Sequence, residues 1–333
     1  MEGAMQQAAQ PGRQSMRDDI IVPMPVVERT RLAPSPTGSL HLGNARTFLI
    51  NWALARRSGW RILLRIEDLD GPRVKPEAVD GLRRTLEWLG LDWDEGPLVQ
   101  SEELAPYREA METLAGSAAA FPCARTRGEL AAASAPQEGV HETPYPRELR
   151  PVTWDKTFRE GVNWRFLVTD GPVPFIDAVH GPQAPDLASL IGDFTVWTKR
   201  AVPAYQLAVV VDDHRQGVTQ IVRGDDLLDS AARQLLLYRA LGLGPEPAYT
   251  HLPLVRGPDG KRLAKRHGDS RIDGYREAGA SPERVIGLLA GWSGLGRNPM
   301  SAAEFRDSFS LTSLPKDPVV FTQADDDWLR SRI

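Results

Sequence analysis

The chain has 333 residues, of which 41% are hydrophobic and 25% carry a charged side chain, and its formal net charge is −4. This composition is that of an ordinary globular protein with room for two domains. No stretch approaches the roughly 18 consecutive apolar residues that a membrane helix needs, so we expect no membrane partner. A nucleic-acid partner would have to be bound by a local basic patch, because the overall charge is negative.

Residues 1–26 are polar and contain Gln, Gly and Pro. They lack the apolar core of a signal peptide, and we interpret them as a disordered N-terminal tail of a cytoplasmic protein. The sequence has one cysteine, Cys123, which cannot form an internal disulfide and by itself does not predict a metal site.

Strand and helix patterns alternate in residues 27–114. The elements expected there are a strand at 26–32, a turn at 33–38, a helix at 44–58, a strand at 62–66 and a helix at 76–89. Gly59 and Gly90 follow the two helices and are typical of helix ends. The order strand–helix–strand–helix predicts an α/β fold, with a doubly wound parallel sheet whose first half lies in this segment.

Residues 115–200 are rich in Ala, Pro and Gly and have weak periodicity, so we interpret them as an inserted, irregular acceptor-type subdomain. Strong patterns return at 201–256, which we expect to complete the sheet. The elements expected there are buried apolar strands at 207–211 and 218–222, a helix at 225–241 and a strand at 251–255. Residues 257–333 hold a basic loop and a C-terminal helical part, with a helix at 282–292 and a polar tail.

The first candidate site lies between the first strand and the first helix, at residues 31–44. Gly38 and Gly43 permit close backbone approach to a phosphate, and the helix start at Asn44 offers unpaired N–H groups and the positive end of a dipole. His41 can donate a hydrogen bond to a phosphate oxygen as charge develops there. A strand–helix turn with an incidental histidine explains the same residues, and their spacing alone leaves both interpretations open.

A longer match decides between them. The run from Pro34 to Gly43 resembles the HIGH signature of class I aminoacyl-tRNA synthetases, in the Pro-Ser-Pro-Thr-Gly-x-x-His-x-Gly form of the glutamyl enzymes rather than the Pro-Glu-Pro-Asn-Gly form of the glutaminyl enzymes. Residues 65–70 are similar to the Arg-Ile-Glu-Asp-Thr-Asp strand end of the same family. The resemblance implies a Rossmann-like catalytic domain that takes ATP with Mg²⁺ as substrate. It implies that His41 is catalytic and that His41, Gly43 and Asn44 bind ATP.

The second candidate site is the glycine-bounded basic loop at 259–268. Such a run fits a solvated face or an RNA contact, and it also fits a mobile cover over a triphosphate. The loop resembles the KMSKS signature, which implies that Lys265 is catalytic and that Arg262 and Lys265 bind ATP. Ala264 replaces the family's serine, and because one lost hydrogen bond weakens transition-state binding by about 1 kcal/mol, we expect activity to survive.

Three charged residues lie at predicted strand ends: Arg31, Arg223 and Glu67. Two arginines and one carboxylate can bind an amino acid that has two carboxylates and one ammonium, which is glutamate or aspartate. Ion pairs with nearby aspartates explain each arginine equally well. The resemblance to glutamyl enzymes implies that Arg31 binds the side-chain carboxylate and Glu67 the α-ammonium. The glutamate-binding residues that it implies are Arg31, Leu32, Ala33, Pro34, Ser35, Glu67, Tyr205 and Arg223. Asp212, Asp213 and His214 receive no role beyond shaping the site.

The resemblance covers about residues 27–295, and the roughly forty residues after it are too few for a separate anticodon-binding domain. The chain is therefore similar to the compact glutamyl-Q tRNA(Asp) synthetases, which activate glutamate without tRNA and transfer it to queuosine in the anticodon loop of tRNA(Asp). The alternatives are a truncated glutamyl-tRNA synthetase that charges tRNA(Glu), a tRNA-binding paralogue with a decayed site, and a nucleotidyltransferase with a small acceptor. The expected partners are ATP, L-glutamate and tRNA, without DNA, and the expected state is a monomer.

Many compact members of this family bind zinc through Cys-x-Cys and Tyr-x-x-x-Cys. Here these segments are Cys123-Ala-Arg125 and Tyr145-Pro-Arg-Glu-Leu149, so only Cys123 and Tyr145 remain. A structural zinc ion takes about four ligands. We therefore predict that zinc is absent and that packing alone holds the insertion, with a site rescued by His141 and Glu142 as the alternative.

Overall fold

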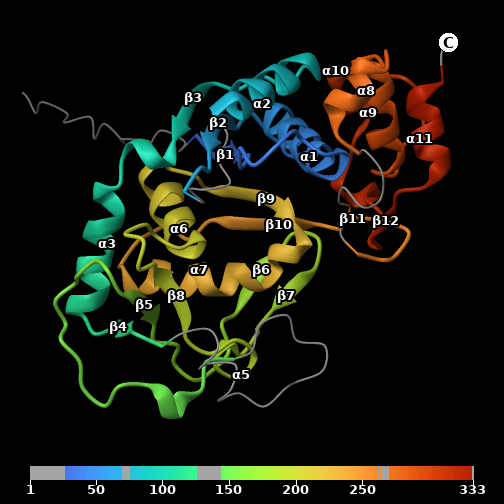
Figure 1. The fold of residues 1–333 in the computed structure, drawn as a ribbon. Coiled ribbons are helices and arrows are strands. Elements are labelled where there is room, and N and C mark those ends of the chain that lie inside the picture. Colours follow the sequence, from blue (N-terminus) through green and yellow to red (C-terminus); the bar gives the residue numbers. More distant parts are fainter. Residues whose placement is uncertain (1–26, 70–75, 126–143, 262, 264–269, 332–333) are drawn as a thin grey trace, which may run out of the picture.

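The structure is a computed structural model that describes residues 27–69, 76–125, 144–261, 263 and 270–331 (Figure 1). The tail predicted at 1–26, part of the basic loop and the segment with His141 and Glu142 lie outside the described residues.

A parallel sheet lies at the centre of the catalytic part, as the order of strands and helices predicts. Its strands are β1 (Arg29–Leu32), β2 (Arg61–Ile66), β3 (Glu95–Val99), β9 (Gln220–Gly224) and β10 (Ala248–Leu252). β1 pairs with β2, β2 with β3 and β9 with β10, all in parallel. β9 lies alongside β1, where the N–H of Thr219 donates to the Arg29 carbonyl at 2.9 Å. These strands belong to two sheets, β1-β2-β3 and a four-stranded sheet that includes β9 and β10, and this contact places them edge to edge, so that the strand order β3-β2-β1-β9-β10 is that of a doubly wound arrangement.

Helices cover both faces of this sheet (Figure 1). α1 (Leu42–Ser58) and α2 (Pro76–Trp88) lie on one face, and α6 (Tyr205–Arg215) and α7 (Leu228–Ala240) lie on the other. α1 ends at Gly59, whose φ of 72° is the left-handed conformation that the sequence predicts at this stop. Each face therefore has its own apolar core.

The strands divide their side chains between these two cores, because successive residues of a strand point to opposite faces. The strand residues in the core beside α1 include Leu32, Leu64 and Val222. Their neighbours, which point toward α6 and α7, are Arg31, Arg65 and Arg223. The alternation thus places three arginines on one face of the sheet.

The prediction of a strand at 207–211 is wrong, because these residues lie inside α6. Leu207, Val209 and Val210 are buried, since the helix packs between the sheet and its neighbouring helices. A helix that is buried on most sides carries a continuous apolar run, which has the same pattern as a buried strand. Tyr205, one of the predicted glutamate-binding residues, is the first residue of this helix.

The insertion has more regular structure than its composition indicates. β4 (Ala120–Cys123), β5 (Asn163–Phe166) and β8 (Phe194–Trp197) form an antiparallel sheet after α3 (Ala105–Gly116). A hairpin of β6 (Phe175–Asp177) and β7 (Gly181–Gln183), followed by α5 (Leu187–Leu190), joins the central sheet through β10. Trp164 and Trp197 are fully buried in the same core as α6 and α7. These strands are too short and too often broken by Pro and Gly to give a clear period in the sequence.

The strand predicted at 251–255 is divided in two. β10 ends at Leu252 and β11 (Val255–Arg256) starts three residues later, because Pro253 has no N–H to continue the ladder. The tail returns to this point, where β12 (Val319–Val320) pairs in parallel with β11. The remaining helices are α8 (Ile272–Glu277), α9 (Pro282–Gly291), α10 (Ala302–Ser308), α11 (Gln323–Arg330) and the 3-10 turns η2 (Gln100–Glu102), η3 (Arg147–Leu149), η4 (Asp225–Leu227) and η6 (Leu311–Ser313). In the described part of the chain, none of the helices has the length and apolar character to cross a bilayer.

Candidate active site

The predicted phosphate site is at the N-terminal end of α1. His41 precedes the helix, and its Nδ1 lies 3.1 Å from the hydroxyl oxygen of Ser270. The N–H of Leu42 donates to the Ser270 carbonyl at 3.0 Å, and the N–H of Ile272 donates to the Leu40 carbonyl at 2.9 Å. The first turn of a helix has N–H groups without intrahelical acceptors, so a phosphate can bind there. Gly43 is part-buried and Asn44 is exposed in this turn.

The basic loop begins and ends beside this turn. Leu263, a described residue within the loop, donates its N–H to the Val255 carbonyl at 3.2 Å, and a Cβ built on Gly43 would lie 3.5 Å from Cβ of Val255. After the loop comes Ser270, which contacts His41. The described residues within and after the basic loop are therefore neighbours of the HIGH turn in space.

Arg262 and Lys265, the ATP-binding residues predicted in this loop, lie outside the described residues, as does Ala264. Their roles stay predictions. What the structure fixes is the position of the loop's two ends beside the HIGH turn.

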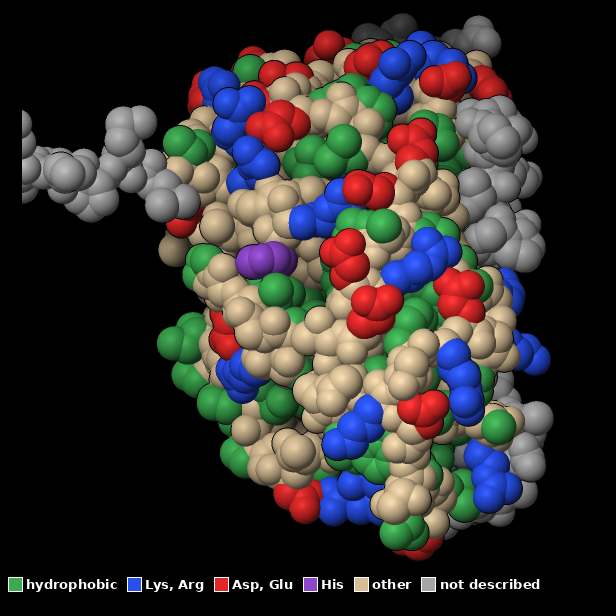
Figure 2. Space-filling model, turned by 90° about the vertical axis from the view of Figure 1, so that its left-hand side faces the viewer, with side chains coloured by type: hydrophobic (Ala, Val, Ile, Leu, Met, Phe, Trp, Pro, Cys, Tyr) green, Lys and Arg blue, Asp and Glu red, His purple; other side chains and the backbone are tan. Residues whose placement is uncertain are grey.

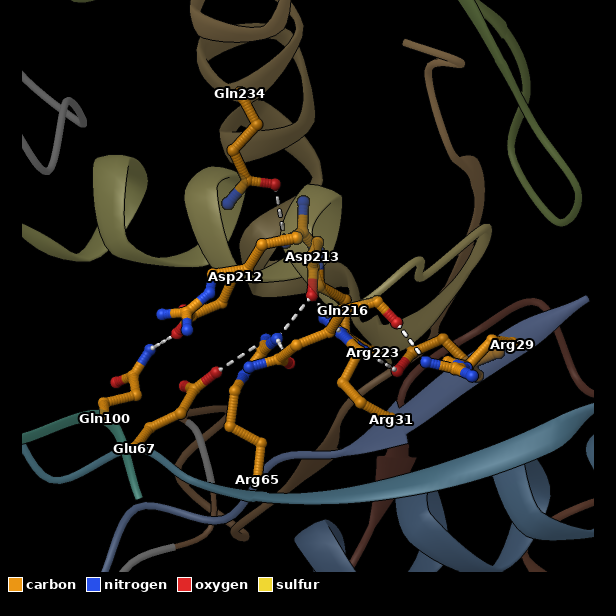
Figure 3. A network of polar contacts seen from close by, with 12 residues as sticks. Arg29, Arg31, Arg65, Glu67, Gln100, Asp212, Asp213, Gln216, Arg223 and Gln234 are labelled. Carbon is orange, nitrogen blue, oxygen red and sulfur yellow. Dashed lines mark hydrogen bonds and ion pairs between the residues drawn. The ribbon is translucent and has the colours of Figure 1, made fainter. Parts of the chain in front are cut away.

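The predicted glutamate pocket is centred on a buried network beneath α6 (Figure 3). Oδ1 of Asp213 accepts hydrogen bonds from Nε of Arg31 at 3.3 Å and from Nη1 of Arg65 at 2.7 Å. Nη2 of Arg65 donates to Oε1 of Glu67 at 3.2 Å. The side chains of Arg31, Arg65 and Asp213 are 5%, 0% and 1% exposed, so these charges interact with little screening by water.

Glu67 follows the carboxyl end of β2 and is the pocket's predicted ammonium ligand. Its N–H donates to the Pro34 carbonyl at 3.0 Å, which joins the ends of β1 and β2. Burial raises the pKa of Glu67 above its ordinary value, although Arg65 and Arg31 oppose the shift. An incoming ammonium would supply the further positive charge that keeps this carboxylate ionised.

Arg223 lies on the neighbouring strand β9, where the register pairs it with His251 of β10. Its Nε donates to Nε2 of His251 at 3.0 Å, and its Nη1 donates to Oε1 of Gln234 at 2.9 Å. His251 in turn contacts Oδ2 of Asp177 through Nδ1 at 2.7 Å. Arg223 is therefore held by side chains from β10 and α7.

The other predicted glutamate residues surround this network. Tyr205 is 41% exposed at the start of α6, within electrostatic range of Glu67, Arg223 and Arg31. The side chain of Leu32 lies in the core beside α1, so only its backbone can face a ligand on the α6 side. The remaining predicted residues are Ala33, which is part-buried, Pro34, which is buried, and Ser35, which is exposed.

Sequence reasoning gave no role to several residues of this site. Arg65 was recognised only as part of a motif, and Asp213 only as a neighbour of the site. Ser270, His251 and Gln234 carried no signal, because a polar residue in a helix or after a loop is common on any surface. Burial of a charged residue is the informative feature, and it appears only with the fold.

The positions that the resemblance assigns to zinc do not form a zinc site. Sγ of Cys123 lies 3.8 Å from the hydroxyl of Tyr145, which donates to the Leu149 carbonyl at 3.0 Å. Phe121 packs on Tyr145 with ring centroids 5.8 Å apart. One thiol and one phenol leave a tetrahedral ligand set incomplete, so these side chains do not fit the metal. Among the described residues, no three His, Cys, Asp or Glu side chains gather as a metal site would require.

The face shown in Figure 2 carries Lys and Arg side chains interspersed with Asp and Glu. No extended patch of one sign is visible among the described residues of this face.

The fold and the paired motifs define a class I aminoacyl-tRNA synthetase. The chain belongs to the family described as tRNA synthetases class I (E and Q), catalytic domain, which matches residues 27–328. It is 48% identical over 307 residues to a glutamyl-Q tRNA(Asp) synthetase of Symbiobacterium thermophilum, which covers 87% of this chain and 94% of that protein. A second glutamyl-Q tRNA(Asp) synthetase, of Rhodopirellula baltica, is 48% identical over 283 residues, which are 80% of this chain and 84% of that protein.

Full glutamyl enzymes are also similar to the chain. A glutamate–tRNA ligase of Geobacter sulfurreducens is 39% identical over 305 residues, which are 90% of this chain and 65% of that protein. The solved structure of a glutamate tRNA ligase of Elizabethkingia meningosepticum in complex with its amino acid matches with a TM-score of 0.76 and 29% identity, over 91% of this chain and 69% of that one. These relatives confirm the predicted Rossmann-like fold, the ligase class of the enzyme and the resemblance to glutamyl-Q tRNA(Asp) synthetases.

Proposed function

We propose that this enzyme activates L-glutamate with ATP, without tRNA, and transfers the glutamyl group to queuosine in the anticodon loop of tRNA(Asp). The activation of glutamate is supported by the pocket of Arg31, Glu67 and Arg223, which lies at the carboxyl ends of adjacent strands, next to the HIGH turn. Two cations and one anion complement the two carboxylates and one ammonium of glutamate.

The activation step follows from this placement. Arg31 binds the side-chain carboxylate and Glu67 the α-ammonium, which leaves the α-carboxylate free to attack the α-phosphorus of ATP. The new bond gives glutamyl-adenylate, and pyrophosphate leaves. His41 and Lys265 stabilise the negative charge on the phosphate oxygens, with Gly43 and Asn44 at the helix start. In the second step the acceptor attacks the glutamyl carbonyl and AMP leaves.

The acceptor is supported by the relatives rather than by a residue of this chain. The two glutamyl-Q tRNA(Asp) synthetases match most of the chain and most of their own length at 48% identity. A glutamyl-tRNA synthetase activity toward tRNA(Glu) is the second candidate, favoured by the glutamate–tRNA ligase at 39% identity.

The test uses labelled glutamate with tRNA from cells with and without queuosine. Label that appears only on queuosine-containing tRNA(Asp) supports the proposal, and label on the 3′ end of tRNA(Glu) supports the second candidate. Pyrophosphate exchange in the absence of tRNA tests activation alone. If aspartate or glutamine drives exchange better than glutamate, the assignment of the pocket is wrong.

Two variants test the residues. Arg31→Ala should mainly raise the KM for glutamate, and an unchanged KM would remove Arg31 from the pocket. Lys265→Ala should reduce adenylate formation at least about tenfold, because it removes a charge that stabilises the transition state.

A further inference from the structure

One carboxylate oxygen contacts residues on both sides of the proposed glutamate pocket, the side of Arg31 and the side of Glu67. Oδ1 of Asp213 accepts from both Arg31, at 3.3 Å, and Arg65, at 2.7 Å (Figure 3). Arg31 and Arg65 come from adjacent strands, and Asp213 comes from α6, which crosses above them. Without this carboxylate, two buried guanidinium groups would face each other on one side of the sheet.

The contact with Arg31 determines which part of its guanidinium is left for a ligand. Asp213 takes Nε, and the Val222 carbonyl takes Nη1 at 3.5 Å. Within the described part of the chain this leaves both hydrogens of Nη2, and the second hydrogen of Nη1, for a ligand carboxylate. Because a guanidinium is planar, fixing Nε also fixes the direction of Nη2.

The contact with Arg65 affects the side of the pocket that holds Glu67. Arg65 donates through Nη1 to Asp213 and to Oε1 of Gln216 at 2.9 Å, and through Nη2 to Glu67 at 3.2 Å. The orientation of the Glu67 carboxylate therefore depends on how Arg65 is held. Asp213 thus contacts Arg31, the proposed ligand of the side-chain carboxylate, directly. It is linked through Arg65 to Glu67, the proposed ligand of the ammonium.

We propose that Asp213 is a positioning residue that sets the separation between Arg31 and Glu67, and with it the length of the amino acid that the pocket accepts. This inference rests on the proposed function, because it concerns how the same pocket selects glutamate. Asp213 does not touch the amino acid, and its effect passes through the two arginines. Losing it should raise the KM for glutamate and weaken discrimination against the shorter aspartate.

The substitution Asp213→Asn removes the negative charge of the side chain and keeps its shape. The amide oxygen can still accept from both arginines, while the negative charge is lost. The amide nitrogen would take the place of Oδ2, which makes no hydrogen bond in the described part of the chain, so no existing contact is broken. The variant therefore weakens two charge-assisted hydrogen bonds without changing the volume of the side chain.

The preceding residue, Asp212, provides a matched control. It is 1% exposed, but its Oδ2 accepts from Gln100 at 2.7 Å and from the Tyr107 hydroxyl at 2.8 Å, on the side toward η2 and α3. Asp212→Asn removes a buried carboxylate from the same helix turn. This carboxylate interacts electrostatically with Arg65, but within the described residues its hydrogen bonds go to Gln100 and Tyr107 and not to Arg31 or Arg65. A purely structural role for Asp213 predicts equal effects of the two substitutions on melting temperature and on kinetics.

The experiment measures glutamate-dependent pyrophosphate exchange by the full chain, with melting temperatures. For Asp213→Asn we expect the KM for glutamate to rise about tenfold. The substitution removes the negative charge of Asp213, and hydrogen bonds between two ions are stronger than those between an ion and a neutral group. The KM for ATP should stay within about twofold, and the preference for glutamate over aspartate in kcat/KM should fall. Asp212→Asn should lower the melting temperature and leave the KM for glutamate within about twofold.

Equal KM values for glutamate in the two variants, or an unchanged preference over aspartate in Asp213→Asn, would overturn the inference. If Asp213→Asn does not fold, Arg65→Lys replaces it. That variant keeps the positive charge but cannot donate to Asp213 and Glu67 from two separate nitrogens, and an unchanged KM for glutamate would equally refute the positioning role. A wild-type protein without exchange refutes the proposed function itself, whereas an active wild type with unaffected variants refutes only the role of Asp213.

Discussion

Arg223 donates from Nε to Nε2 of His251 at 3.0 Å, between two strands whose register pairs these residues. An arginine is always a donor, so Nε2 must accept and the imidazole proton must lie on Nδ1. Nδ1 then donates to Oδ2 of Asp177 at 2.7 Å. Burial lowers the pKa of His251 and the positive charge of Arg223 acts in the same direction, although the hydrogen bond to Asp177 opposes the shift, so the net effect favours the neutral ring.

Replacing His251 with alanine removes both hydrogen bonds of this buried ring. We expect Arg223 to lose its fixed orientation, and the KM for glutamate to rise about tenfold while the KM for ATP changes little. Stability should fall by about 2–4 kcal/mol, because the buried Nε of Arg223 loses its acceptor and the Asp177 carboxylate loses one of its donors. Denaturant unfolding and exchange kinetics measure the two effects. His214→Ala, an exposed histidine of the same protein, is the control, and equal effects of the two substitutions would contradict the role given to His251.

The raised pKa of Glu67 predicts a pH dependence of glutamate binding. A carboxyl whose pKa is higher in the folded state stabilises the fold fully below its unfolded pKa, and this contribution is lost as pH rises through the folded pKa. Binding of an ammonium requires the ionised form, so binding should release a proton where Glu67 is still protonated. We expect the KM for glutamate to rise as pH falls through the raised pKa of Glu67. Glu67→Gln should bind more weakly with a flat profile, and a wild-type KM that does not depend on pH would argue against Glu67 as the ammonium ligand.

The local parts of this protein could be predicted from sequence. The helix that ends at Gly59 and the strand that ends at Ile66 follow from periodicity and a glycine stop, which depend on neighbouring residues alone. The motif around His41 identified the chemistry because many of its positions match one family. These features need no knowledge of what packs on them.

Features that depend on packing could not be predicted. The residues 207–211 have the apolar run of a strand, and their helical state follows only from burial of α6 between the sheet and its neighbours. Asp213 lies 182 residues from Arg31 in sequence, and nothing in the pair of aspartates at 212 and 213 shows which one turns toward the sheet. The contact of Ser270 with His41 likewise requires the chain to return to α1 after the basic loop.

The insertion provides a test of metal content. The side chains of Cys123 and Tyr145 do not fit a zinc ion, and Phe121 and Trp154, with ring centroids 5.9 Å apart, pack at the same place. We predict that the purified protein contains well under one zinc per chain by elemental analysis, since about four ligands are needed. A chelator should not change its melting temperature. About one equivalent of zinc, lost together with stability on chelation, would contradict this and direct attention to His141 and Glu142.

Gly43 allows the phosphate site to be tested without disturbing the fold. A Cβ at this position would lie 3.5 Å from Cβ of Val255, which is an ordinary contact, so alanine fits the protein itself. In a helix alanine is more stable than glycine by about 0.5–1 kcal/mol, so Gly43→Ala should not lower the melting temperature.

If ATP approaches the backbone at the start of α1, the added methyl group must obstruct it, and we expect the KM for ATP to rise at least about tenfold while the KM for glutamate stays within about twofold. Gly81→Ala is the matched control, because it lies inside α2 and nothing lies within 4 Å of its Cβ position. Both variants should be at least as stable as the wild type, and only Gly43→Ala should affect ATP. Unchanged ATP kinetics in Gly43→Ala would mean that the phosphates do not approach the backbone of this turn.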